Sequence, residues 1–154
     1  MRRITIALLI LIVVVALIVG LRPMTPARTR DDFANKSKDT AESVLSSVQT
    51  ARLTAGVGTR GDAFGPYVSV VLSESDDAVA KAQGSYDRIQ PPDAWSDATR
   101  ARLGRLLDRS GDVVSQLRIV ARRGELDRLE RLARPLRPLA AKLQRFIDDA
   151  GPRP

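Results

Sequence analysis

Apolar and small residues recur at alternating spacings of three and four in four successive segments after residue 30. An average spacing near 3.5 places such residues along one face of an α-helix. No segment alternates with period two over a useful length, so we expect no β-strand. The positions expected to face a core are Ala34, Ser37, Ala41, Val44, Val48, Ala51 and Ala55 in the first segment; Val68, Leu72, Ser75, Val79, Ala82, Tyr86 and Ile89 in the second; Thr99, Leu103, Leu106, Ser110, Val113, Leu117 and Val120 in the third; and Leu126, Leu129, Ala133, Leu136, Ala140, Leu143, Ile147 and Ala150 in the fourth.

Three short breaks separate these segments, with the sequences GVGTRGDAFGP, IQPPD and RRGE. Short connections make consecutive helices antiparallel. The pattern therefore predicts an all-α fold, an antiparallel up-down four-helix bundle over residues 31–150, with 151–154 as a tail. Many of the expected core residues are small and bury little apolar area each, so we expect modest stability or stabilisation by self-association.

The first break, at residues 56–66, contains a G-x-G-x-x-G pattern and the tripeptide Arg60-Gly61-Asp62. A dinucleotide-binding loop needs a strand before its glycines and a helix that starts at the third glycine. Here a helix is expected before the glycines, and the next one begins near Pro66. We interpret the stretch as a turn between two helices rather than as a phosphate-binding or adhesion loop.

The N-terminal segment 4–21, ITIALLILIVVVALIVGL, has eighteen residues and no charge. As a helix it would be about 27 Å long, close to the hydrocarbon thickness of a bilayer. We therefore predict a transmembrane anchor over residues 1–21, followed by a linker with two prolines over residues 22–30. The alternative is a signal peptide cleaved near Ala27, which would release a secreted protein.

The orientation of this predicted span is judged from the charges beside it. Arg2 and Arg3 directly before an apolar core are typical of export signals and favour a cytoplasmic N-terminus. The opposite orientation is favoured by the basic residues that follow the span. These are Arg22, Arg28, Arg30, Lys36 and Lys38. We expect a single-pass cell-membrane protein whose C-terminal domain is extracytoplasmic.

The chain has a net charge of +7, but the charge is unevenly distributed. Residues 61–97 carry a net charge of −5 and residues 100–137 a net charge of +6. Such a succession is typical of neighbouring helices with complementary faces, and the basic part lacks interleaved aromatics, so nucleic acid is not the expected partner. The chain contains neither histidine nor cysteine, which excludes imidazole bases, thiolate nucleophiles and disulfides. We predict no enzyme activity, no cofactor and no metal site.

Two places in the sequence could carry binding. Trp95, after Pro91 and Pro92, either packs at the end of the bundle near Ile89 or Tyr86, or anchors a partner together with Tyr86. Pro135 and Pro138 interrupt the fourth segment, because an interior proline lacks the N–H that a helix needs. The interruption is either a kink, or a helix that breaks near Arg134 and restarts, or a local opening in which Arg134 and Arg137 bind an anion.

The combination of an Arg-Arg and apolar N-terminus, the PP-x-x-W connection and arginine- and alanine-rich helices resembles uncharacterised membrane-anchored or secreted helical proteins of actinobacteria. The resemblance implies only the location of the protein. Our leading hypothesis is a non-enzymatic membrane protein that presents a helical bundle to an envelope protein or to itself. The alternative is a module that binds or senses a small anionic or amphiphilic ligand held between the helices.

Overall fold

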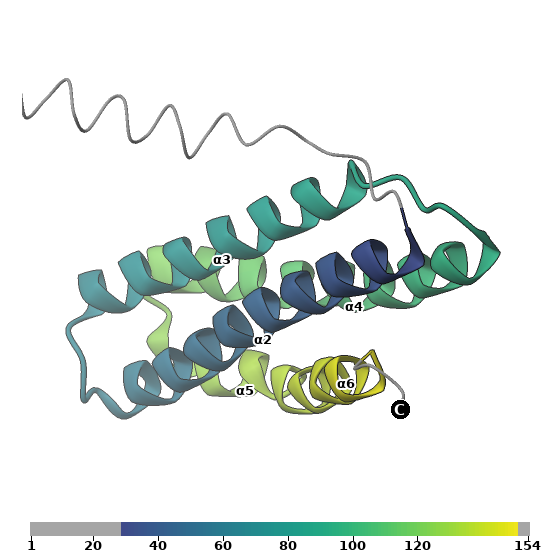
Figure 1. Ribbon diagram of the computed structural model, residues 1–154. Coiled ribbons are helices and arrows are strands. Elements are labelled where there is room, and N and C mark those ends of the chain that lie inside the picture. The colour runs from purple at the N-terminus through teal and green to yellow at the C-terminus, as the bar shows by residue number, and fades with distance from the viewer. Residues whose placement is uncertain (1–28, 151–154) are drawn as a thin grey trace, which may run out of the picture.

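A computed structural model describes residues 29–150, and every regular element in this range is helical (Figure 1). The all-α prediction is thus confirmed for the part of the chain that the structure describes. The elements are α2 (Arg30–Arg60), α3 (Gly65–Asp87), α4 (Ala94–Arg122), a 3₁₀ turn η1 (Leu126–Arg128), α5 (Leu129–Ala133) and α6 (Leu136–Asp149).

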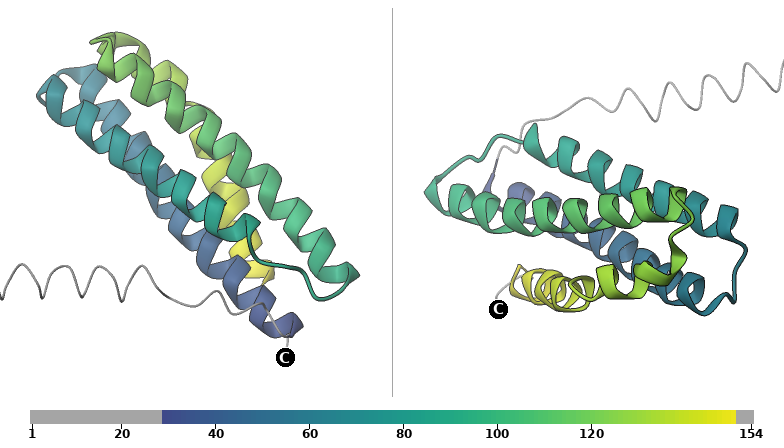
Figure 2. Two further views of the ribbon diagram at one scale, coloured as in Figure 1. Left: turned by 90° about the horizontal axis from the view of Figure 1, so that it is seen from above. Right: turned by 180° about the vertical axis from the view of Figure 1, so that it is seen from behind.

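Helix α2 is the central element of the bundle. It contacts α3, α4, η1, α5 and α6, and Figure 1 shows it between α3 on one side and the α5–α6 arm on the other. The long helices α2, α3 and α4 run antiparallel in succession, and α6 returns beside α2 and α4 (Figure 2). The start of α4 therefore lies beside the start of α2, where Arg30 pairs with Asp93 at 3.1 Å.

The helix ends follow from local side-chain chemistry. Thr29 caps α2 by accepting a hydrogen bond from the N–H of Asp32 at 3.1 Å, and Asp93 caps α4 by accepting one from the N–H of Ser96 at 2.8 Å. These bonds satisfy N–H groups that have no acceptor inside the helix. Pro66 lies in the first turn of α3, where a missing N–H costs nothing.

The first break is shorter than the sequence predicted. Helix α2 continues through Gly56 and Gly58 to Arg60, so only the second half of GVGTRGDAFGP forms the turn. Gly61 has φ 73°, and its N–H donates to the carbonyl oxygen of Gly58. A Cβ at Gly58 would lie 3.1 Å from Val68 and 3.2 Å from Leu129, so a residue without a side chain lets α2 pack closely against α3 and α5 here.

The core consists of one buried stripe from each helix, and most of the predicted positions are in it. The main exceptions are shifts to a neighbouring residue. Phe33 is buried instead of Ala34, Val114 instead of Val113, and Leu139 instead of Ala140, while the residues that were predicted are only partly buried. Between two buried positions seven residues apart, residues at i+3 and at i+4 both lie near the same face, so the pattern alone does not decide which of the two is buried.

The fourth segment is not one helix, as the two prolines indicated. Helix α5 ends at Ala133 and α6 starts at Leu136, with Arg134 and Pro135 between them. Pro138 lies in the first turn of α6. Backbone N–H groups in a first turn have no acceptor inside the helix, so the lack of an N–H at Pro138 costs no helical hydrogen bond. The predicted kink is therefore a break in the helix next to Arg134.

Tyr86 does not lie on the surface, so it offers no contact to a partner of the folded bundle. Its side chain is buried between α2 and α3, and its ring centroid lies 6.0 Å from that of Phe33. Its hydroxyl lies 3.1 Å from Oγ of Ser37, which itself donates to the carbonyl oxygen of Phe33. The Ser37 hydroxyl thus links the Tyr86 hydroxyl to the backbone of α2.

The predicted anchor and linker lie almost entirely outside the described residues, as does the tail at 151–154. None of the helices between residues 29 and 150 has the length and apolar character to cross a membrane.

The close approach at Gly58 predicts opposite effects for two glycine-to-alanine substitutions. Gly84→Ala, where a new Cβ meets nothing within 4 Å, should raise the free energy of unfolding by about 0.5–1 kcal/mol. Gly58→Ala should lower it by about 1 kcal/mol, because Val68 and Leu129 are fully buried and cannot yield without strain. Urea unfolding followed by circular dichroism measures both. Equal stabilisation by the two changes would show that the contact is loose.

The buried phenol predicts a loss of stability at high pH. Burial raises the pKa of Tyr86 above its ordinary value of 10.0, although the hydrogen bond with Ser37 acts in the opposite direction. The unfolded chain therefore loses this proton first, and stability should fall as the pH rises above about 10 toward the pKa of the folded state. Tyr86→Phe should remove this part of the pH dependence, as measured by urea unfolding at several alkaline pH values. An unchanged pH profile would contradict the assignment.

Candidate functional site

An open cleft of about 510 Å³ lies between the second half of α2 and the broken fourth segment. We call it the arginine cleft. Its lining contains four arginines, one acid and several apolar or small residues. These are Arg52, Leu53, Gly56, Val57, Arg60, Glu130, Ala133, Arg134 and Arg137.

The break between α5 and α6 forms one wall of the arginine cleft, and a hydroxyl on α2 fixes the position of that wall. Thr59 on α2 accepts a hydrogen bond from the N–H of Glu130 at 3.0 Å. Its hydroxyl also lies 3.1 Å from the carbonyl oxygen of Leu126 and 2.9 Å from that of Ala55. The start of α5 is thus held against α2, and α6 begins after the break at Arg134 and Pro135.

The lining of the cleft is strongly positive. Arg60 forms an ion pair with Asp62 at 2.8 Å. For Arg52, Arg134 and Arg137, no carboxylate among residues 29–150 lies within ion-pair distance. Unpaired like charges repel one another, so their convergence does not stabilise the fold. An incoming anion would relieve this repulsion.

The cleft also has an apolar part. The side chain of Leu53 is 62% exposed, and Val57 lies one turn further along α2. Guanidinium groups match the planar geometry of carboxylate and phosphate, and the neighbouring apolar surface suits a hydrocarbon chain. The arrangement can therefore bind an amphiphile with an anionic head. Within residues 29–150, no group of three or more acids is placed to hold a metal ion.

The sequence prediction named two of the four arginines in this cleft. Arg134 and Arg137 lie in its lining as part of the predicted opening. Arg52 and Arg60 were missed, because they belong to a helix far away in the sequence. Their spacing of eight residues places them about 80° apart around α2, so the sequence of this helix alone does not indicate that both line one cleft.

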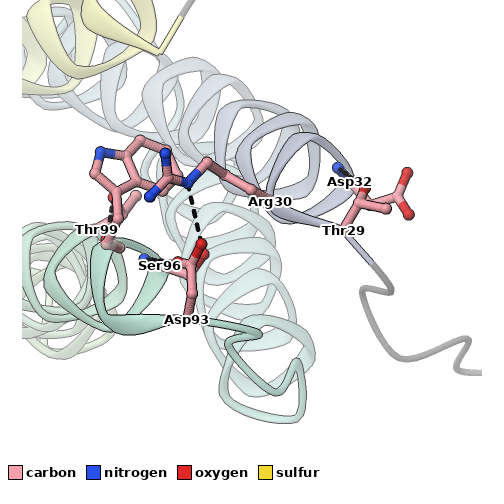
Figure 3. Close-up of polar contacts among 7 residues, drawn as sticks. Thr29, Arg30, Asp32, Asp93, Ser96 and Thr99 are labelled. Atoms are coloured by element: carbon pink, nitrogen blue, oxygen red, sulfur yellow. Dashed lines mark hydrogen bonds and ion pairs between the residues drawn. The ribbon is translucent and has the colours of Figure 1, made fainter.

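Trp95 lies at the other end of the bundle, and the structure does not bring it near the arginine cleft. It is 41% exposed, and the guanidinium of Arg30 lies 4.9 Å from the centroid of its ring. Figure 3 shows Arg30 reaching from the start of α2 to Asp93 at the start of α4. The hydrogen bond from the backbone N–H of Ser96, together with the charge of Arg30, lowers the pKa of Asp93, so this carboxylate stays ionised beside the arginine. Trp95 thus remains available to a partner only in part.

Comparison of the chain with protein-family models, with curated proteins and with solved structures finds no match. The interpretation of the site therefore depends on its own residues and geometry.

Proposed function

We propose that this chain is a non-enzymatic binding protein whose arginine cleft holds a small amphiphile with a carboxylate or phosphate head. The observation that carries the proposal is the convergence of four arginines beside exposed apolar surface, in one cleft between α2 and the broken fourth segment. This develops the ligand-binding alternative drawn from the sequence, for which Arg134 and Arg137 were the candidate residues.

The dimensions and chemistry of the cleft agree with this ligand class. Its volume of about 510 Å³ lies within the range of small-molecule sites. Arg134 and Arg137 would contact the head from the fourth segment and Arg52 would contact it from α2, while Leu53 and Val57 would contact the hydrocarbon chain. Each hydrogen bond to a charged group contributes about 1.5–3 kcal/mol, so two guanidinium groups are enough for measurable affinity.

The proposal includes a location at the membrane. Residues 4–21 would anchor the chain as a single-pass helix, with residues 22–30 as linker and the bundle outside the cytoplasm. The support is the uncharged run of eighteen residues in the sequence. Cleavage near Ala27 would instead give a secreted form with the same cleft.

Binding of hexyl phosphate to the full chain in phosphatidylcholine nanodiscs tests the proposed ligand class. Calorimetry should show that hexyl phosphate binds more tightly than inorganic phosphate and that hexanol does not bind. The variant Arg134→Gln/Arg137→Gln should weaken hexyl phosphate at least about tenfold, because two charged hydrogen-bond donors are removed. Leu53→Asn should reduce its affinity toward that of inorganic phosphate.

A matched control separates local binding from general loss of charge. Lys81→Gln/Arg88→Gln removes the same number of charges from α3 and the residue that follows it, outside the cleft, and should leave hexyl phosphate affinity within about twofold. Equal weakening by both double variants would contradict the proposal. So would tight binding of hexanol, which would indicate an apolar site only.

A second candidate function is the protein–protein interaction or self-association favoured by the sequence. The observation that supports it is an exposed apolar strip at the start of α3. Phe64, Tyr67 and Val70 are 76%, 63% and 54% exposed, and each is three residues from the next and so its neighbour on the surface. Because the small residues of the core bury little area, association of two copies through this strip would add apolar burial.

This second candidate predicts a concentration-dependent dimer. Analytical ultracentrifugation of the detergent-solubilised full chain should detect it, and Phe64→Ser/Tyr67→Ser should weaken it at least about tenfold, since aromatic side chains dominate such contacts. Trp95→Ala, at the other end of the bundle, is the control for self-association. A monomer at all concentrations would exclude a dimer through this strip.

A further inference from the structure

A second basic surface lies between α4 and α6. Five cationic side chains line a groove of about 210 Å³ with Leu106 among them. We call it the α4–α6 basic groove. Its cations are Arg102, Arg105, Arg109, Lys142 and Arg145.

The cations of this groove are not explained by the packing of the bundle. Arg102 pairs with Asp149 at 2.8 Å and lies 5.5 Å from the centroid of the Phe146 ring. The other four have no carboxylate of residues 29–150 within ion-pair distance. On the side of α4 that faces α3, by contrast, Arg118 pairs with Asp76 at 2.7 Å. One side of α4 thus has matched charges, and the other has an excess of positive charge.

The groove continues into an apolar hollow. A neighbouring hollow of about 300 Å³ shares Arg109 and Lys142 with it and is lined further by Val113 and Leu139, by Pro135 and Pro138, and by Asp112. Single-stranded nucleic acid is usually bound by cations together with exposed aromatic platforms. Neither hollow has an aromatic residue in its lining. Cations beside apolar surface are instead suited to a phospholipid, because its phosphate is anionic and its acyl chains are apolar.

The groove lies toward the end of the bundle at which α2 begins. The Arg30–Asp93 pair joins the starts of α2 and α4, and the Arg102–Asp149 pair joins α4 to the end of α6. Along α4, Arg109 is about 24 Å from Asp93 at 1.5 Å per residue. Residues 22–29 can span up to about 28 Å between residue 21 and the start of α2. All five cations are therefore within reach of the surface of a membrane that contains residues 4–21.

We propose that the α4–α6 basic groove binds the anionic phospholipid headgroups of the membrane that anchors the chain, so that the bundle lies with this face against the bilayer. The inference rests on the proposed anchor at residues 4–21. It is independent of the arginine cleft, which shares no lining residue with the groove. Negative leaflet charge attracts basic segments near the surface, and salt weakens this attraction.

Because the chain contains no cysteine, a single introduced cysteine can carry a fluorophore at a chosen position. Ala98→Cys, one turn before Arg102, places a fluorophore beside the groove, and Ala80→Cys places it on α3; both positions are exposed. The labelled full chain is reconstituted in nanodiscs of phosphatidylcholine, or of an equimolar mixture with phosphatidylglycerol, each containing a nitroxide-headgroup lipid. Quenching at Ala98 should be at least about twofold greater with phosphatidylglycerol and should lose this increment in high salt, while quenching at Ala80 should not change.

Two triple variants separate this inference from the proposed ligand site. Arg105→Gln/Arg109→Gln/Arg145→Gln should abolish the phosphatidylglycerol-dependent increment but retain hexyl phosphate binding. Arg52→Gln/Arg134→Gln/Arg137→Gln should lose hexyl phosphate binding but retain the increment. These side chains are exposed and make no ion pair within residues 29–150, and an unchanged circular dichroism spectrum verifies that each variant is folded.

Four outcomes would overturn the inference. The first is equal quenching at Ala98 in both kinds of nanodisc, and the second is a phosphatidylglycerol-dependent increment that survives in the Arg105→Gln/Arg109→Gln/Arg145→Gln variant. The third is a fluorescence response to duplex DNA without any response to phosphatidylglycerol. The fourth is a chain that does not co-elute with nanodiscs. Only the last would also overturn the proposed anchor. If the wild-type chain shows the phosphatidylglycerol-dependent increment in quenching but does not bind hexyl phosphate, only the proposed ligand site is overturned.

Discussion

The missing N–H of Pro135 is the constraint on which both candidate binding surfaces depend. A continuous fourth helix would pack its stripe against α2 and α4 along its whole length. The proline instead separates α5 from α6, and Thr59 holds the start of α5 against α2 while α6 follows after the break. The arginine cleft opens between α2 and this break, and the hollow that continues the α4–α6 basic groove is lined by the same proline.

The rest of the bundle tolerates this break because α2 carries most of the packing. Its buried face consists largely of alanine, serine, glycine and valine, so neighbouring backbones approach closely, as at Gly58. Small residues bury little area, and the larger side chains come from the partners of α2, such as Leu72, Leu107 and Leu143. The hydrogen bond between Tyr86 and Ser37 adds a specific polar contact to this otherwise apolar interface.

Much of the fold could be predicted from the sequence, because the information on each helix is local. The stripes identified most of the core, and Pro135 located the break to within a residue. The end of α2 was predicted too early, because glycines are common where helices end, whereas Gly58 lies inside α2 and leaves room there for Val68 and Leu129. Tyr86 was offered as a surface residue although its place in the stripe indicated burial.

The candidate site was less predictable than the fold, because it is formed by segments that are far apart in the chain. Arg134 and Arg137 could be singled out by the neighbouring prolines. That Arg52 and Arg60 face the same opening follows only from the position of α5 and α6 on α2. The same is true of the α4–α6 basic groove, where Arg105 and Arg109 meet Lys142 and Arg145 across two helices.

The central claim is that the arginine cleft is an anion-binding site, and side-chain NMR of the arginine Nε–H groups tests it most directly. Titration of the full chain in nanodiscs with hexyl phosphate should shift the resonances of Arg52, Arg134 and Arg137 together and saturably, while those of Arg88 and Arg122 stay in place. Small, non-saturating shifts of all arginines alike would show only general ion screening. That result would contradict the account.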